Sequence, residues 1–189
     1  MARGRKRILF IGAPEHGKST QLKKLIDNSR EGVIVHNQGQ QKVYSDLPVI
    51  SFEQLKKMKS GKYQIQEPDH LEFFKTVYEN FRNGFVVGED SSEYMPPQKI
   101  QAIYKLVVGL RHKGIDLALI FHAIAETPPY IIRQANEIIL FKTSDNWENV
   151  KERFPLHLQD YCEKIFNEVN TSTNKFTFKR MILQKTGTL

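Results

Sequence analysis

Hydrophobic residues along this chain fall into short continuous runs, separated by stretches in which they recur every three or four positions. The continuous runs predict buried strands, because a strand covered on both faces of a parallel sheet carries apolar residues on both. The clearest runs are residues 8–11, 33–36, 85–90, 116–122 and 137–142. The run 116–122 is expected at the centre of the sheet. Residues 63–66 and 176–183 predict two further strands.

The intervening stretches predict helices with one apolar face. They are a helix that follows residue 17 and helices over residues 51–61, 69–83, 96–114, 127–134 and 158–169. Ser51 with Gln54, and Asp69 with Glu72, have the spacing of a capping box, which satisfies two backbone N–H groups at a helix start. The core face of the 69–83 helix is predicted to consist of Leu71, Phe74, Val77, Tyr78 and Phe81.

Strands and helices alternate throughout, with no internal repeat and no linker-like composition. This order predicts one three-layer α/β domain over residues 1–189 with a largely parallel central sheet, because parallel strands need crossover connections. A chain of 189 residues, of which 40% are hydrophobic, can form the core of one such domain and has no room for a second of useful size.

The composition indicates which partners the protein contacts and in which cellular compartment it is found. The 28 Lys and Arg residues outnumber the 21 Asp and Glu residues, and the net charge of +7 favours contact with polyanions such as nucleic acid. The basic residues concentrate at residues 3–7, 23–24 and 56–62. Nothing resembles a signal peptide or a membrane span, and the single cysteine, Cys162, has no partner for an internal disulfide. We therefore expect a reducing, cytoplasmic location.

Residues 12–19 match the phosphate-loop pattern G-x-x-x-x-G-K-[ST] completely, between a predicted strand and a predicted helix. In such a loop the glycines let the backbone N–H groups surround the phosphates of a nucleotide, and the helix N-terminus adds positive charge. Lys18 is expected to bridge the β- and γ-phosphates of ATP, Ser19 to bind Mg²⁺ and Thr20 to reach the α-phosphate. The residues predicted to contact the nucleotide are Gly12, Ala13, Pro14, Glu15, His16, Gly17, Lys18, Ser19 and Thr20.

The strand over residues 85–90 ends in two acids, Glu89 and Asp90. Nucleotide hydrolysis needs one carboxylate for the magnesium ion and one that orients the attacking water, on a strand beside the loop. By position Glu89 takes the metal and Asp90 the water, although the usual order of such acids is Asp before Glu. His122 ends the next strand, where a polar side chain can sense the γ-phosphate.

These motifs and the stretch over residues 120–143, "IFHAIAETPPYIIRQANEIILFKT", resemble the ATPases of the FtsK-HerA type. This family includes viral genome-packaging ATPases, DNA-pumping motors and the Zot-like proteins of filamentous phages. The resemblance covers residues 7–143, departs from the family at His122, where an amide is common, and does not extend to residues 144–189.

The resemblance implies a RecA-like P-loop NTPase fold, with the strands that end in Asp90 and His122 beside the phosphate-loop strand. It also implies a ring, usually of six subunits, in which a neighbour supplies an arginine to each nucleotide. Arg133 is the preferred candidate for that arginine and Arg111 the second. The family's role implies an ATPase that moves viral or phage DNA without reading its sequence, in the host cytoplasm or the virion, with a portal, capsid or membrane complex as partner.

The phosphate loop alone also fits a small kinase that transfers phosphate to a nucleotide or metabolite. A lid rich in paired arginines would support a kinase, and none is evident in residues 114–137. The Asn-Lys-x-Asp signature of a GTPase is absent, because "NKFT" at Asn174 lacks the acid. A binder that uses ATP only as a structural switch stays open.

Overall fold

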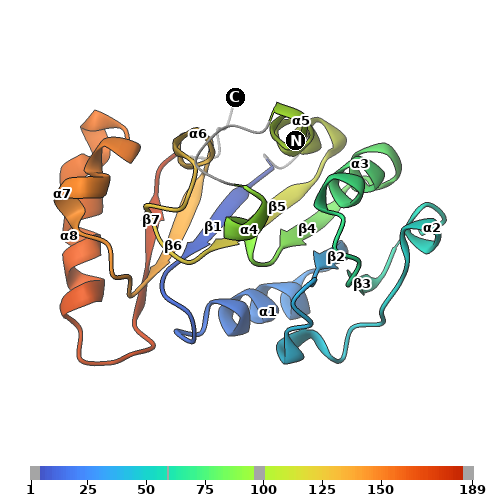
Figure 1. Ribbon diagram of the computed structural model, residues 1–189, viewed down its shortest axis with the longest axis horizontal. Helices are drawn as coiled ribbons and strands as arrows, with labels where there is room; N and C mark the ends of the chain where they lie inside the picture. The colour runs from blue at the N-terminus through green and yellow to red at the C-terminus, as the bar shows by residue number, and fades with distance from the viewer. Residues whose placement is uncertain (1–4, 59, 96–100, 185–189) are drawn as a thin grey trace.

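The computed structural model describes residues 5–58, 60–95 and 101–184 and contains one seven-stranded sheet in the order β3-β2-β4-β5-β1-β6-β7. The strands are β1 (Arg7–Ile11), β2 (Gly32–His36), β3 (Lys62–Ile65), β4 (Gly84–Gly88), β5 (Asp116–Phe121), β6 (Glu137–Phe141) and β7 (Phe178–Ile182). All pairings are parallel except that of β6 with β7 (Figure 1). The predicted α/β fold with a largely parallel sheet is confirmed.

The strand order corrects one expectation. The resemblance implies that the strands leading to Asp90 and His122, which are β4 and β5, both lie beside β1. Of these two strands only β5 pairs with β1. β4 pairs with β5 and β2, so one strand separates it from β1. The continuous apolar runs identify the strands, but they do not show which strands pair. Every residue of β5 is buried, as predicted for a central strand.

Helices cover both faces of the sheet (Figure 1). The α-helices are α1 (Lys18–Asn28), α2 (Phe52–Leu55), α3 (His70–Asn80), α4 (Ser91–Tyr94), α5 (Gln101–Gly109), α6 (Pro129–Ile132), α7 (Trp147–Val150) and α8 (Gln159–Thr171). The 3-10 helices are η1 (Lys42–Tyr44), η2 (Leu110–Lys113), η3 (Lys151–Arg153) and η4 (Leu156–Leu158). One core cluster joins α3, α5, α6 and α8 to the sheet face that carries Leu9, and a second joins α1 and η1 to the face that carries Phe10.

The helix starts agree with the predicted caps. Ser51 and Gln54 form both bonds of a capping box at α2. Asp69 accepts a hydrogen bond from the backbone N–H of Glu72 (2.8 Å), so the first half of the second box is also present. On α3, however, Phe73 is fully buried and Leu71 is 45% exposed, which makes the predicted membership of Leu71 in the core wrong.

Several predicted elements differ in extent. The predicted start of a helix at Pro96 lies outside the described residues; from Gln101 the helix continues through η2 to Gly114, which has φ 73° and ends it. The helix predicted over residues 127–134 is only the four-residue α6. The elements α4, α7 and η1 were not predicted, because four residues or fewer carry no readable periodicity.

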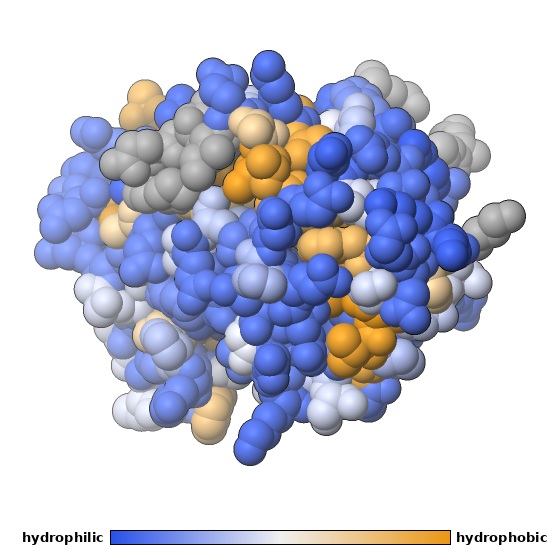
Figure 2. Space-filling view, turned by 45° about the vertical axis from the view of Figure 1, so that its right-hand side comes forward, coloured by the Kyte–Doolittle hydropathy of each residue, from blue (hydrophilic) through white to orange (hydrophobic). Residues whose placement is uncertain are grey.

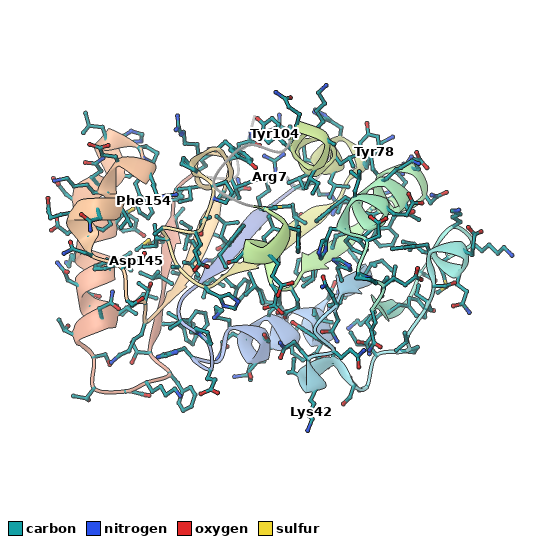
Figure 3. The ribbon with its side chains drawn as sticks, in the orientation of Figure 1. Arg7, Lys42, Tyr78, Tyr104, Asp145 and Phe154 are labelled. Carbon is teal, nitrogen blue, oxygen red and sulfur yellow. The ribbon has the colours of Figure 1, made fainter. Side chains whose placement is uncertain are left out.

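The surface is mostly hydrophilic on the side where α2 and α3 lie, with small separate hydrophobic patches (Figure 2). Lys42 of η1 points away from the protein (Figure 3). No helix in the described ranges combines the length and the apolar character that crossing a membrane requires.

Candidate functional site

The loop between β1 and α1 forms the centre of the candidate site, at the edge where the parallel strands end. A Cβ on Gly12 would lie 2.6 Å from the Cβ of Phe141 and 2.9 Å from the carbonyl oxygen of Lys142. Gly17, which precedes α1, has φ 88°, a conformation that residues with a side chain rarely adopt. The first glycine is therefore required for close packing on β6, and the second for the turn into the helix.

The backbone N–H groups of this loop divide into two sets. Gly12 donates to the carbonyl oxygen of Phe121 on β5 (3.2 Å), and Ala13 donates to that of Lys142 after β6 (2.8 Å). These bonds fix the loop to both strands that neighbour β1. The N–H groups in the first turn of α1 have no carbonyl acceptor within the helix. An anion at this helix start meets these donors and the positive end of the helix dipole.

Lys18 is buried beneath the loop, with its ammonium group directed at the loop backbone. Its Nζ donates hydrogen bonds to the carbonyl oxygens of Gly12 (2.6 Å) and Ala13 (2.8 Å). Burial lowers the pKa of Lys18 to about 8, while the nearby Glu89 and Asp90 act in the opposite direction. A phosphate group would supply the anionic acceptor that this desolvated ammonium lacks in its present bonds to neutral carbonyls.

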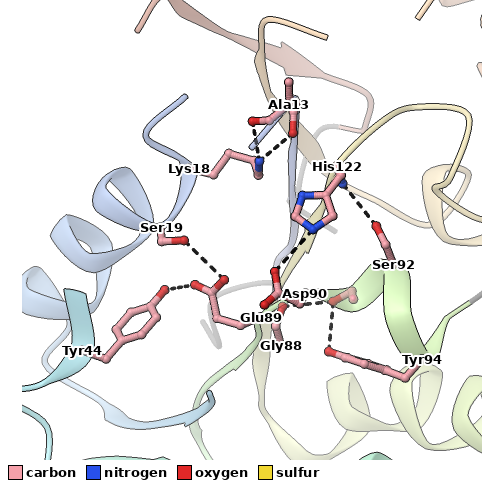
Figure 4. A network of polar contacts seen from close by, with 12 residues as sticks. Ala13, Lys18, Ser19, Tyr44, Gly88, Glu89, Asp90, Ser92, Tyr94 and His122 are labelled. Carbon is pink, nitrogen blue, oxygen red and sulfur yellow. Dashed lines mark hydrogen bonds and ion pairs between the residues drawn. The ribbon is translucent and has the colours of Figure 1, made fainter. Parts of the chain in front are cut away.

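Glu89 lies next to Ser19, as a shared magnesium site requires (Figure 4). The hydroxyl of Ser19 donates to Oε2 of Glu89 at 3.3 Å, and the hydroxyl of Tyr44 donates to Oε1. Burial raises the pKa of Glu89 to about 7 and raises the pKa of Tyr44 above its ordinary value. Tyr44 and Ser19 thus each hold one oxygen of the Glu89 carboxylate in place.

Asp90 and His122 form a second polar pair beside the loop. Asp90 has φ 47°, where β4 ends and α4 begins, and its Oδ1 lies 3.5 Å from Nε2 of His122. The hydrogen bond with His122 and, less strongly, one with Gln41 lower the pKa of Asp90. The backbone N–H of His122 donates to the hydroxyl of Ser92 (3.2 Å). The Nδ1 atom of His122 is buried and has no hydrogen-bond partner among the described residues.

Ser19 and Glu89 fit a magnesium ion that is bound together with a nucleotide. Mg²⁺ prefers oxygen ligands, and in nucleotide sites it is usually held by one or two carboxylates, substrate phosphates and waters. A hydroxyl and a carboxylate oxygen 3.3 Å apart supply the protein's share of such a ligand set. In the ranges that the structure describes, no group of three or more His, Cys, Asp and Glu side chains could hold a metal. A magnesium ion held by these two side chains would take its remaining ligands from phosphate oxygens and waters.

Arg133 and Arg111 lie away from this group of residues. Both are exposed, and they belong to segments at the opposite edge of the sheet, where β5 and β6 begin. The backbone oxygen of Arg133 accepts a hydrogen bond from Gln184 (2.8 Å). Burial and, to a smaller extent, the charge of Arg111 lower the pKa of Arg7, which lies at the start of β1 and is labelled in Figure 3. With about 3.3 Å per residue, the length of a five-residue strand, roughly 16 Å, separates this edge from the phosphate loop.

The structure thus brings together Lys18, Ser19, Glu89, Asp90 and His122 and leaves both arginines outside. The sequence motifs do not indicate Tyr44 or Gln41, which bond Glu89 and Asp90. They also do not indicate Lys175 and Phe176, which lie against the phosphate loop. The register of β2 with β4, in which His36 pairs with Gly88, explains why residues after β2 reach Glu89. Loops that follow adjacent parallel strands meet at one edge, so the strand order would have indicated Tyr44.

No family model matches the sequence, and no curated protein matches it. Solved structures do resemble the fold. The genome-packaging NTPase B204 of Sulfolobus turreted icosahedral virus 2, in complex with AMP, matches with a TM-score of 0.74 and 16% identity over 95% of this chain and 93% of that one. Its complex with ATP-gammaS matches with a TM-score of 0.72, 16% identity and coverage of 94% and 92%.

The N-terminal domain of zonular occludens toxin from Neisseria meningitidis is similar over a smaller part. Its TM-score is 0.51 at 15% identity, over 74% of this chain and 78% of that one. At these identities the comparisons show the fold, which is that of the P-loop NTPases. The predicted resemblance to packaging ATPases and Zot-like proteins is confirmed at that level.

Proposed function

We propose that this chain is an Mg²⁺-dependent ATPase that drives the movement of DNA, as a viral or phage genome-packaging ATPase. The observation that carries this proposal is the convergence of Lys18, Ser19, Glu89 and Asp90 at one edge of the sheet, from two segments that are far apart in the sequence. The fold shared with B204, a protein described as a genome-packaging NTPase and solved with AMP and ATP-gammaS, supports it.

Each residue has a role that follows from its position. The first turn of α1 and Lys18 bind the phosphates, and Ser19 with Glu89 holds the metal, which when bound neutralises charge on the phosphate oxygens. Asp90, whose pKa is lowered, is ionised and can orient a water for attack and take up its proton. His122 fixes the Asp90 carboxylate through its Nε2 atom.

The ring and the DNA are part of the same proposal. The position of Arg133 and Arg111 at the edge opposite to the phosphate loop is compatible with an arginine that acts on a neighbouring subunit's nucleotide, and not on the nucleotide of its own chain. The net charge of +7 supports contact with DNA phosphates without base readout. A ring of six subunits, acting with a portal, capsid or membrane complex, completes the proposal.

Phosphate release from ATP with Mg²⁺, measured with and without DNA, tests the core of the proposal. Lys18→Ala removes the charge-assisted contact to the phosphates and is expected to abolish turnover. Lys24→Ala, which changes an exposed lysine of the same helix, is the matched control and is expected to keep it. Unchanged turnover after Lys18→Ala would exclude the phosphate loop as the site.

The same preparation distinguishes a motor from a small kinase. Transfer of phosphate from ATP to nucleoside monophosphates is measured beside phosphate release. Rapid transfer to an acceptor, with hydrolysis that ignores DNA, would replace the motor with the kinase.

A further inference from the structure

The 172–177 loop, which joins α8 to β7, lies against the phosphate loop. The Cδ1 atom of Phe176 is 3.6 Å from the position that a Cβ on Gly17 would take. The ammonium group of Lys175 lies 3.5 Å from Oε2 of Glu15. Figure 1 shows the turn between α8 and β7 on the same side of the molecule as the start of α1. A segment from the far end of the sequence therefore borders the nucleotide site.

Hydrogen bonds hold this loop in one shape. The side chain of Asn174 accepts from the backbone N–H of Phe176 (2.9 Å), and the backbone oxygen of Asn174 accepts from the N–H of Thr177 (3.2 Å). The hydroxyl groups of Ser172 and Thr177 are 2.7 Å apart, and the ammonium group of Lys142 donates to the backbone oxygen of Ser172. The backbone that carries the ring of Phe176 is thus held by the protein itself.

The ring of Phe176 is also largely uncovered. The residue is 60% exposed, whereas most large hydrophobic side chains of this protein are buried in its two core clusters. An aromatic ring held in water on an ordered loop gains free energy when a flat apolar surface covers it. The position therefore favours a ligand with an aromatic face.

The order of the strands indicates which part of a nucleotide reaches this ring. Glu89, Asp90 and His122 lie on the side of β1 where β5 and β4 are, and they are the residues suited to the terminal phosphate. The ribose and the base must leave the phosphate loop in a different direction. Phe176 stands on the other side of β1, just before β7 in the order β5-β1-β6-β7.

We propose that Phe176 is the stacking platform for the purine base of the nucleotide. This inference rests on the proposed function, because it needs a nucleotide whose phosphates occupy the loop. Stacking accepts any base, since every base has a π-face. Phe176 therefore contributes affinity for the nucleoside part and little discrimination between ATP and GTP.

Binding of three ligands in the presence of Mg²⁺ tests this inference by titration calorimetry: ATP, GTP and inorganic tripolyphosphate. Phe176→Ala is expected to lower the affinity for ATP and for GTP about tenfold each, in the range known for the loss of one base stack. It is expected to change the affinity for tripolyphosphate by less than about twofold. Phe176→Tyr keeps an aromatic ring and is expected to bind ATP and GTP as tightly as the unchanged protein does. Leu156→Ala, which changes an 84% exposed side chain on η4, is the control and is expected to leave all three unchanged.

The possible outcomes separate this inference from the proposed function. If Phe176→Ala lowers the affinity for ATP and for tripolyphosphate equally, Phe176 only supports the loop. If it does not lower the affinity for ATP, the base lies elsewhere. Either result overturns the stacking platform, while ATP binding by the unchanged protein still supports the proposed function. If the unchanged protein binds neither ATP nor tripolyphosphate, the proposed function fails, and the platform fails with it.

Discussion

Glu89 and Asp90 are adjacent in the sequence, but their side chains have different surroundings. Glu89 is buried between Ser19 and Tyr44, and its pKa is raised to about 7. Asp90 is less buried, is bonded to His122, and its pKa is lowered. Two carboxyl groups whose environments separate their pKa values in this way are suited to separate tasks.

Replacing each acid in turn should separate the two tasks. Glu89→Ala is expected to raise the Mg²⁺ concentration needed for half-maximal ATP binding by about tenfold or more, because a metal ligand is lost. Asp90→Ala is expected to keep ATP binding and to lower kcat by a factor of about 100 or more, the usual contribution of a proton acceptor. Nucleotide binding and phosphate release, each titrated with Mg²⁺, measure both effects.

Glu93→Gln is the control for these variants, since Glu93 is an exposed acid on the neighbouring α4. It is expected to behave like the unchanged protein. Normal hydrolysis by both the Glu89→Ala and the Asp90→Ala variants would show that neither acid is catalytic.

His36 is a buried histidine in a cluster of rings. Its ring stacks on Phe73 at 4.3 Å, and its Nε2 lies 2.9 Å from the backbone oxygen of Glu67. A carbonyl oxygen only accepts, so Nε2 carries the hydrogen in the neutral ring. Burial lowers the pKa of His36 to about 4 and, to a smaller extent, lowers that of His70, whose ring lies beside it. Glu67, Asp69 and Glu93 are the acidic residues around this pair.

This cluster predicts a loss of stability in mild acid. In the unfolded chain His36 binds a proton near pH 6.5, while in the folded protein it stays neutral down to about pH 4. The unfolded state therefore gains this proton first, and the contribution of His36 to the free energy of unfolding falls as the pH drops from 6.5 to 4, while the raised pKa of Glu89 acts in the opposite direction. At 1.36 kcal/mol per pKa unit the loss amounts to about 3 kcal/mol. Urea unfolding at a series of pH values measures it.

Comparison of two variants isolates the contribution of His36. His36→Phe keeps a flat ring against Phe73 and is expected to remove the contribution of His36, so that acidification from pH 6.5 to 4 costs this variant about 3 kcal/mol less stability than it costs the unchanged protein. His157→Gln changes an exposed histidine and is expected to lose as much stability on acidification as the unchanged protein does. An unaltered pH dependence in His36→Phe would assign the acid sensitivity to other groups.

At the scale of the elements, the start of β4 packs closely against β2. A Cβ on Gly84 would lie 2.4 Å from the ring of Phe81 and 2.7 Å from the backbone oxygen of Gly32. A Cβ on Gly32, the paired residue, meets nothing nearer than 3.4 Å.

These two glycines give a matched pair of variants. Gly84→Ala is expected to destabilise the protein by about 1–3 kcal/mol, because backbone cannot move aside as a flexible side chain can. Gly32→Ala is expected to change stability by less than about 0.5 kcal/mol. Thermal or urea unfolding measures both, and an equal effect of the two changes would contradict the packing described for β4.

The sequence predicted all seven strands, five of them from continuous apolar runs. The sequence was a weaker guide to which face of a helix is buried, because that depends on packing. Leu71 fits a 3.6-residue period as well as Phe73 does, but it lies about 120° around the helix axis from the centre of the stripe formed by Phe73, Val77 and Phe81. Only the position of α3 on the sheet selects one stripe over the other.

The candidate site also contains residues that local sequence motifs indicate and residues that only the packing of the chain brings there. Lys18, Ser19, Glu89, Asp90 and His122 could be predicted because each belongs to a local motif or ends a strand. Tyr44 and Phe176 could not, because they reach the site only through the pairing of β2 with β4 and the return of the chain to the sheet at β7.

At the scale of the whole molecule, the net charge of +7 predicts a salt-dependent response to DNA. Contacts with DNA phosphates release counterions, so affinity falls steeply as salt rises. Stimulation of the ATPase by DNA is therefore expected to fall at least about tenfold between roughly 50 and 200 mM salt, while the basal rate changes much less. An ATPase rate that ignores DNA at low salt would contradict the motor.

The proposed ring predicts complementation between two inactive variants. Arg133→Ala keeps an intact phosphate loop, and Lys18→Ala keeps the arginine. Mixed subunits are expected to recover part of the activity, because the loop of one can receive the arginine of the other. Arg111→Ala mixed with Lys18→Ala is the comparison that identifies which arginine acts. Absence of recovery in both mixtures, or a protein that stays monomeric with nucleotide and DNA, would contradict an arginine shared between subunits.

The central position of β1 in the sheet has a consequence for synthesis of the protein. β1 is the first strand to be translated, yet its partners are β5 and β6, and Arg7 pairs with Leu117, about 110 residues later. At about 5–20 residues per second, the ribosome needs roughly 5–20 seconds to make β5 after β1. During that time β2, β3 and β4 can pair with one another, whereas the apolar β1 and its phosphate loop have no described strand to join. The candidate site is thus assembled late, and a chain that stops before Asp116 carries the complete phosphate-loop motif without the strands that hold it in place.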